Sequence, residues 1–333
     1  MTIQSLLAHS LVGRLGDPAS RTRDAVATLS EELSTGRVAD AGMAMRHDFS
    51  ALAQAERDLA IHASLRGSVQ AGQRLASAAG ASFDRIGAEI DLLREAFKPH
   101  VTGGAVPGAA EAGAAAEGAL RQILAALDLT VDGRAVMAGG RTDVAAHDGA
   151  DALFADLDAL AAAAPDAATL RADVRAYFEG GAYAAARLPA GSPAGIEIRT
   201  GIDAEASWRI GMDDPAVIAV LAEVGEAVAL TRSAFADDAA ARDFYATGMP
   251  GNVARAADGA IALRARTGAL EARLDAAAEA LERGRFDAEG RRDALVGADP
   301  YETATRLQDE TARLETVYTL TARLSRLRLT DYL

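Results

Sequence analysis

Residues 82–97 read SFDRIGAEIDLLREAF, and their apolar side chains recur in alternating steps of three and four residues. The apolar positions are Phe83, Ile86, Ile90, Leu93 and Phe97. This spacing places side chains on one stripe of an α-helix, the seam along which a second helix packs. From Ser50 to Lys98 only scattered glycines interrupt helix-forming sequence, and Pro99 follows. The stretch therefore predicts one long helix with a heptad seam.

A second seam of the same kind lies in the other half of the chain. Its positions are Leu263, Thr267, Leu270, Leu274, Ala277 and Leu281. Asp214 and Pro215 predict the start of a further helix, which we expect to continue to about Thr247, with the aspartate as N-cap and proline at the first helical position. Segments 41–149 and 213–294 are thus expected to form a helical rod.

The middle of the chain has strand-like sequence. Asp132 and Gly133 are typical of a tight hairpin turn, so a short hairpin is expected within the rod. Further along, apolar and polar residues alternate, which predicts a small strand pair. The apolar members are Ile196, Ile198, Trp208, Ile210 and Met212. We expect residues 150–212 to form a small inserted α+β domain.

Both ends of the chain carry apolar stripes, although chain ends are usually frayed and polar. The stripe residues expected to make contacts are Ile3, Leu7, Leu11, Leu307, Leu314, Val317, Leu324 and Leu327. Segments 1–40 and 295–333 are interpreted as helical arms that pair on assembly. The predicted fold class is mainly α: a discontinuous helical rod built from N- and C-terminal segments, with the inserted domain.

Composition argues against several classes of function. The 333 residues include no cysteine and carry a formal net charge of −14, and basic residues do not cluster with aromatic ones, so no nucleic-acid partner is expected. No apolar run is long enough for membrane insertion. The five histidines lack metal-ligand spacing, and the glycine-rich stretches match no phosphate-binding motif. We therefore predict no enzyme activity, no catalytic or metal-binding residue and no cofactor.

Three stretches resemble the flagellin family. Residues 29–38 (LSEELSTGRV) are similar to the end of its first helix, and residues 132–143 (DGRAVMAGGRTD) to a hairpin that follows. The C-terminal stretch, which comprises residues 297–308 (GADPYETATRLQ), 314–318 (LETVY) and 324–333 (LSRLRLTDYL), is most similar to the ends of the family's hook-filament junction proteins. The resemblance implies a structural subunit of the bacterial flagellum that joins hook to filament by polymerisation of its terminal helices. A flagellin filament subunit is the alternative within the family.

Membership would carry further expectations. The resemblance implies secretion through the flagellar type III export apparatus without a cleaved signal peptide, and self-association in a ring. It implies contact with another hook-associated protein and with flagellin, and an export chaperone bound to the C-terminal helix. From a different class, a helical-bundle signalling or interaction protein would share the heptads, but a membrane span or a hairpin of continuous helix would be expected there.

Overall fold

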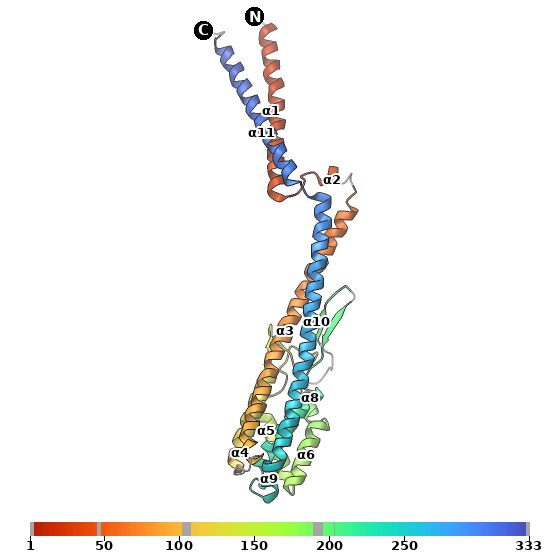
Figure 1. Ribbon diagram of the computed structural model, residues 1–333, viewed down its shortest axis with the longest axis vertical. Coiled ribbons are helices and arrows are strands. Elements are labelled where there is room, and N and C mark those ends of the chain that lie inside the picture. The colour runs from red at the N-terminus through yellow and green to blue at the C-terminus, as the bar shows by residue number, and fades with distance from the viewer. Residues whose placement is uncertain (1–2, 45–47, 102–107, 189–195, 203, 331–333) are drawn as a thin grey trace. The chain divides into compact units, whose positions relative to one another are not determined.

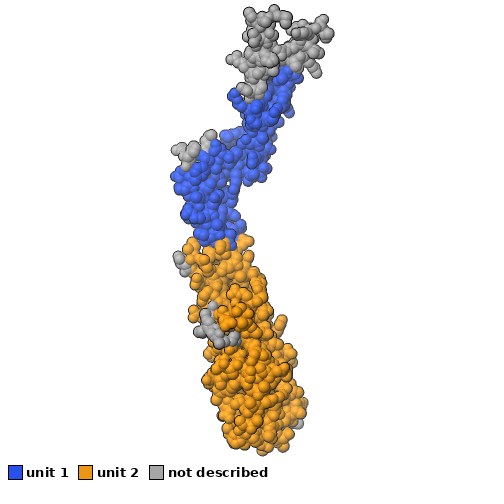
Figure 2. Space-filling view, turned by 180° about the vertical axis from the view of Figure 1, so that it is seen from behind, with its two compact units in different colours: residues 1–63, 282–333 blue, residues 64–281 orange. Residues whose placement is uncertain are grey.

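A computed structural model describes residues 3–44, 48–101, 108–188, 196–202 and 204–330. For residues 3–18, 43–44, 98–101 and 324–330 the description is limited to the helical backbone. The chain is mainly helical, as predicted. It divides into two compact units: unit 1 contains residues 1–63 and 282–333, and unit 2 contains residues 64–281 (Figure 2).

Two long helices, α3 (Ser50–Val101) and α10 (Met249–Val296), carry the two predicted seams. Within unit 2 they are linked by a 2.7 Å hydrogen bond from Gln73 to Asp275 and by an ion pair between Arg264 and Asp84. All five heptad positions from residue 83 to residue 97 are buried, as are five of the six on α10, Ala277 being half-buried. The heptad interpretation of both stretches is confirmed.

The core of unit 2 surrounds α8 (Pro215–Thr231), on which every side chain from residue 220 to residue 230 is buried. Three helices pack against it: α4 (Ala109–Leu127), α5 (Ala150–Ala163) and α6 (Ala167–Glu179). Asp214 caps α8 as predicted, because its Oδ1 accepts a 2.9 Å hydrogen bond from the Ala216 amide. A helix buried on all sides needs an almost continuous apolar sequence, which α8 has.

The predicted helix from residue 215 to about residue 247 is wrong in its length. α8 ends at Thr231, and α9 (Ala239–Asp243) and one π-helical turn, η1 (Phe244–Gly248), follow before α10. At the break, the hydroxyls of Thr231 and Ser233 donate to carbonyls of the last turn of α8. Such side-chain bonds to the backbone compete with continued helix.

Both predicted strand pairs are present. β1 (Thr130–Val131) and β2 (Arg134–Ala135) form an antiparallel hairpin. Asp132 and Gly133 join them at φ 52° and 75°, the left-handed conformation that this turn requires. β3 (Ile196–Arg199) pairs antiparallel with β4 (Glu205–Trp208), with Ile196 opposite Trp208.

The segment 150–212, expected as a separate domain, shares one core with its flanks. It comprises α5, α6, the short α7 (Ala182–Arg187) and the β3–β4 pair. Buried residues of these elements belong to the same hydrophobic cluster as those of α4 and α8. The Trp208 indole also donates a hydrogen bond to the Val136 carbonyl, across the predicted boundary. The core is therefore continuous at both predicted boundaries.

A pair of glycine substitutions tests this packing. A Cβ at Gly225 of α8 would lie 2.8 Å from the Phe178 ring, so Gly225→Ala should lower the free energy of unfolding by about 1–3 kcal/mol. Gly118 lies exposed on α4 with open space at its Cβ, and Gly118→Ala should raise that free energy by about 0.5–1 kcal/mol. Urea unfolding followed by fluorescence of Trp208, the only tryptophan, measures both. If the two substitutions changed the free energy of unfolding equally, the close packing of Gly225 against Phe178 would be contradicted.

Candidate functional site

The terminal helices of unit 1 pack against each other within one chain. α1 (Ile3–Thr35) and α11 (Pro300–Thr330) run side by side in opposite directions (Figure 1). A 2.7 Å hydrogen bond from an Arg23 Nη to the Tyr318 hydroxyl joins them. Unit 1 also contains the short α2 (Ala41–Ala44) and the adjoining ends of α3 and α10.

The face of α11 turned to α1 follows heptad spacing. Its covered positions at this spacing, buried at Thr303 and half-buried at the others, are Thr303, Leu307, Glu310, Leu314 and Val317; Ala304, next to Thr303, is also half-buried. The residues between Glu310 and Leu314 are exposed, as are Glu315 and Thr316. α1 packs along α11, so the covered positions mark their interface. We call these five residues the α11 seam.

The facing side of α1 has smaller and more polar side chains. Thr22 is buried, and Ala25, Val26, Leu29 and Glu32 are half-buried. The spacing again follows a helical stripe. Only two of these five side chains, those of Val26 and Leu29, are larger apolar groups, so α1 covers the α11 seam with a modest apolar surface.

The structure brings some of the predicted contact residues together. Leu307, Leu314 and Val317 share the α11 seam, half-buried. Ile3, Leu7 and Leu11 belong to α1, and Leu324 and Leu327 belong to α11, but their side chains lie outside the described residues. Apolar residues also lie off the seam and exposed: Leu33, Tyr301, Tyr318 and Leu320.

In unit 1, backbone hydrogen bonds connect the end of α1 (residues 36–38) to the turn between α10 and α11 (residues 296–298). We call this connection the joint. Gly36 ends α1 at φ 67°, and its carbonyl accepts a 3.0 Å hydrogen bond from the Ala298 amide. The Val38 amide donates to the Val296 carbonyl at 2.9 Å. Asp299 then caps α11 by accepting from the amides of residues 301 and 302. The joint thus brings together the stretches 29–38 and 297–300.

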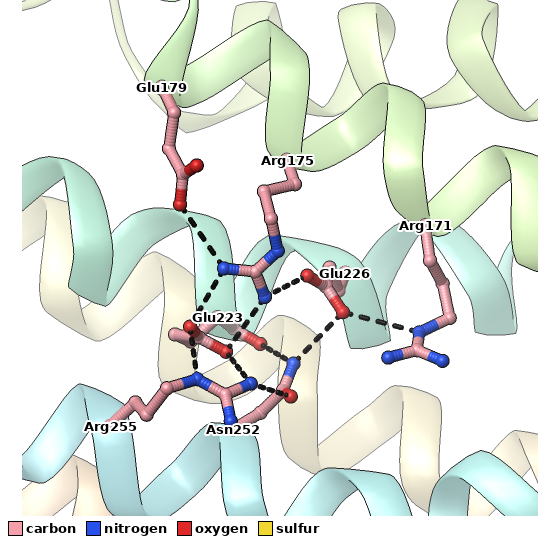
Figure 3. A network of polar contacts seen from close by, with 7 residues as sticks. All are labelled: Arg171, Arg175, Glu179, Glu223, Glu226, Asn252 and Arg255. Carbon is pink, nitrogen blue, oxygen red and sulfur yellow. Dashed lines mark hydrogen bonds and ion pairs between the residues drawn. The ribbon is translucent and has the colours of Figure 1, made fainter.

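Unit 2 contains a cluster of buried charges that sequence reasoning missed (Figure 3). Glu223 and Glu226 on α8 are 3% and 1% exposed. Arg175 of α6 lies between them and bonds both carboxylates. Arg255 of α10 makes two 2.7 Å hydrogen bonds to Glu223. The two glutamates are three residues apart in an otherwise apolar run, a spacing that could have revealed one polar face.

Two further residues complete the cluster. Arg171 of α6 donates to Glu226 at 3.2 Å. Asn252 of α10 donates to the Glu226 carboxylate and to the Glu223 carbonyl, both at 3.1 Å, and accepts from Arg255. Both buried carboxylates are therefore paired with guanidinium groups. The cluster connects α6, α8 and α10, and we interpret it as part of the structure of unit 2 and not as a reactive centre.

The pairing shifts the pKa values of Glu223 and Arg175. Burial, the largest single influence, raises the pKa of the Glu223 carboxyl, but the hydrogen bonds and positive charges of Arg255 and Arg175 together outweigh it and lower the pKa below its ordinary value. The same hydrogen bond to Glu223 is the main cause of a raised pKa for the Arg175 guanidinium. Glu223 therefore stays ionised within the core.

This shift predicts a pH dependence. Because the folded-state pKa of Glu223 is depressed, its carboxylate stabilises unit 2 above the unfolded-state pKa, about 4.3, and that contribution disappears as the pH falls through the lower folded-state pKa. The stability difference between the natural chain and Glu223→Gln should thus be largest at about pH 7 and should decrease steadily as the pH falls below about 4.3 toward pH 3. Urea unfolding by Trp208 fluorescence measures it. A difference that stays constant over this range would contradict the pairing.

The part of the chain that the structure describes contains no metal-binding cluster and no membrane span. There, no three histidine, aspartate or glutamate side chains gather as ligands for a metal ion. No helix in the same residues is long and apolar enough to cross a membrane. The paired terminal helices are the feature of the described chain that most directly offers a contact surface.

Comparison with known proteins adds no relative. No protein-family model matches the sequence, and no curated protein matches it.

Proposed function

We propose that this chain is a structural subunit of the bacterial flagellum that joins hook to filament by polymerisation of its terminal helices. The observation that carries the proposal is the α11 seam, which a single partner helix covers only in part. Leu307, Leu314 and Val317 remain half-buried in the isolated chain, and Tyr318 and Leu320 lie exposed beside them. Helices from neighbouring copies would complete the burial.

The energetics favour association of this kind. Fully burying a leucine or valine side chain contributes about 1.5–3 kcal/mol. Burying the exposed half of each seam residue against a neighbouring copy would contribute part of that free energy. Summed over a ring of copies, such contributions stabilise an assembly although each is small. The proposal therefore assigns no catalysis and no cofactor to the chain, and its work is mechanical.

The joint supports the family assignment. Two of the stretches that resemble the flagellin family contribute to it: residues 29–38, and residue 297 onward, which opens the helix leading to the family-like C-terminal end. Gly36 takes a left-handed conformation that favours glycine, and Arg37 forms a β-bridge with Gly297. Two stretches that are distant in sequence, and that both resemble the same family, thus pair with each other through backbone hydrogen bonds.

The partners and location follow from the proposal. The chain would be secreted through the flagellar type III apparatus without a cleaved signal, assembled as a ring, and placed between another hook-associated protein and flagellin. An export chaperone would bind the C-terminal helix before assembly. A flagellin filament subunit remains the alternative within the family.

Deletion of the gene tests the proposal. Deleted cells should assemble hooks without filaments and release flagellin into the medium, and a plasmid copy should restore filaments. If the chain is instead the filament subunit, no other abundant flagellin should appear in the medium. Normal flagella after deletion would contradict both readings and favour a helical-bundle interaction protein.

A further inference from the structure

A groove on the surface of unit 2 lies between α3 and the end of α4, and we call it the α3–α4 groove. Its volume is about 340 Å³. Ala78, Ala81 and Ala125 line it with methyl groups, and the Ser82 hydroxyl in the same lining already donates to the Ala126 carbonyl. A cavity of about 150 Å³ admits a benzene ring, so this groove has room for one apolar side chain of a partner.

An apolar side chain projects from α10 on another side of unit 2. Ile261 is 67% exposed, and Ala262 and Ala265 beside it are exposed as well. A single exposed apolar residue needs no explanation, but a large side chain within a patch of small ones can act as a knob for a partner's groove. Ile261 lines a separate hollow, between α10 and the side of α3 that carries Asp84 and Asp91. It therefore lies outside the α3–α4 groove of its own chain.

We propose that Ile261 of one copy inserts into the α3–α4 groove of a second copy of this chain. The inference rests on the proposed function, which requires copies to meet, and it adds a contact in unit 2 to the contacts of the terminal helices. Because the knob and the groove are different surfaces, the contact is head-to-tail. Such contacts close into a ring when the rotation between copies allows it.

Charges beside the two surfaces support a second copy as the occupant. Asp258 lies three residues before Ile261 and so on the same side of α10. Arg85 lines the α3–α4 groove, one turn beyond Ala81. Both charged side chains are exposed, and neither has a hydrogen-bonded or ion-paired partner among the residues that the structure describes. With Ile261 in the groove, the Asp258 carboxylate of one copy would pair with the Arg85 guanidinium of the next.

The charges of the groove also set the direction of entry. α4 runs back along α3, since Ser82 and Ala126 are in contact and lie about equally far from the turn that joins the two helices. Asp128 and Arg85 therefore lie toward opposite ends of the groove. An acidic residue beside the knob is attracted by Arg85 and repelled by Asp128, so Asp258 favours one of the two directions.

Disulfide cross-linking between two full-length chains tests the contact, because the natural sequence has no cysteine. An Ile261→Cys chain is mixed at high concentration with an affinity-tagged Ala81→Cys chain and oxidised. A disulfide requires a Cα separation of about 4.4–6.8 Å, so the mixed disulfide should form about tenfold or more faster than with an Ala168→Cys chain. Ala168 is an exposed alanine of α6. Equal rates with the two partners would overturn the proposal.

Charge reversal identifies the surfaces that meet. Adding Asp258→Arg to the Ile261→Cys chain should slow the cross-link to Ala81→Cys about fivefold or more, and adding Arg85→Asp to the partner chain should restore it. Asp243→Arg, an equal change of net charge at an exposed position of α9, should leave the rate unchanged. A loss that Arg85→Asp does not reverse, or an equal loss with Asp243→Arg, would contradict the pairing.

Filling the groove gives an independent result. Ala125→Leu extends a side chain from α4 into the α3–α4 groove, and should slow the same cross-link about tenfold or more. Unchanged fluorescence of the buried Trp208 shows that unit 2 is intact in the variant. An unchanged rate would rule out insertion. These measurements use the purified chain, so their failure is distinct from failure of the flagellar assignment, which the deletion strain tests.

Discussion

Replacing Arg175 with alanine is expected to lower the free energy of unfolding of unit 2 by about 3–5 kcal/mol. Arg175 lies between Glu223 and Glu226 and bonds both carboxylates (Figure 3). Its removal leaves two buried carboxylates with fewer partners, and an incompletely paired buried charge is far more costly than the pair was stabilising. Urea unfolding followed by the fluorescence of Trp208, which is buried in unit 2, measures the change.

The matched control is an exposed arginine on α3. Arg94 pairs with Asp91 one helical turn away, and both side chains are at least half exposed. Arg94→Ala should change the same free energy by no more than about 0.5 kcal/mol, as exposed pairs of this spacing do. If Arg175→Ala were as mild as Arg94→Ala, the cluster would not hold α6, α8 and α10 together.

Replacing Leu314 with aspartate is expected to abolish filament attachment and motility when the variant is the only copy in the cell. Leu314 lies in the α11 seam, half-buried, and assembly is proposed to bury it further. A carboxylate buried there without a partner costs more than the leucine contributed. Swimming assays and electron microscopy of the cells measure the effect, with immunoblots showing how much variant is exported.

Thr316→Asp is the control for that variant. Thr316 is exposed two residues further along the same helix, so a charge there should cost about 0.5 kcal/mol or less and leave motility intact. Trp208 fluorescence should be unchanged in both purified variants, because the substitutions lie in unit 1. Normal motility of the Leu314→Asp cells would place the seam outside the assembly interface.

Sequence periodicity was sufficient to predict the structure where one pattern determines both the local helix and its packing against distant residues. The heptad of residues 83–97 is buried because the same 3.6-residue period decides both helix formation and the face that packs. The turn at Asp132 and Gly133 was predictable because few residue pairs adopt two consecutive left-handed conformations. The cap formed by Asp214 and Pro215 rests on equally local chemistry.

Features that depend on packing were harder to predict. Glu223 and Glu226 are tolerated inside the core because three arginines from other helices form ion pairs with them. No local sequence pattern shows which distant arginines will lie next to these glutamates. The end of α8 at Thr231 depends on hydroxyl bonds that sequence alone leaves optional. The punctuation around residues 150 and 212 suggested a separate domain, but punctuation marks turns and does not show which helices share a core.

The candidate site was predictable in part. The stripe containing Leu307, Leu314 and Val317 was identified from spacing, and these residues do share one covered face of α11. Pairing of the two terminal segments was expected on assembly, whereas α1 and α11, almost 300 residues apart, already pack against each other within one chain. Leu33 and Leu320 belong to the apolar content of the same helices but lie exposed, since helix rotation is fixed by the partner helix.

The central claim, that this chain joins hook to filament, is tested most directly by immunogold electron microscopy of intact cells with an antibody against unit 2. The account predicts gold particles confined to a narrow band where each hook meets its filament, and none in cells that lack the gene. Particles along the whole filament would assign the chain to the filament itself. Flagella without any label, in cells that produce the chain, would contradict the account.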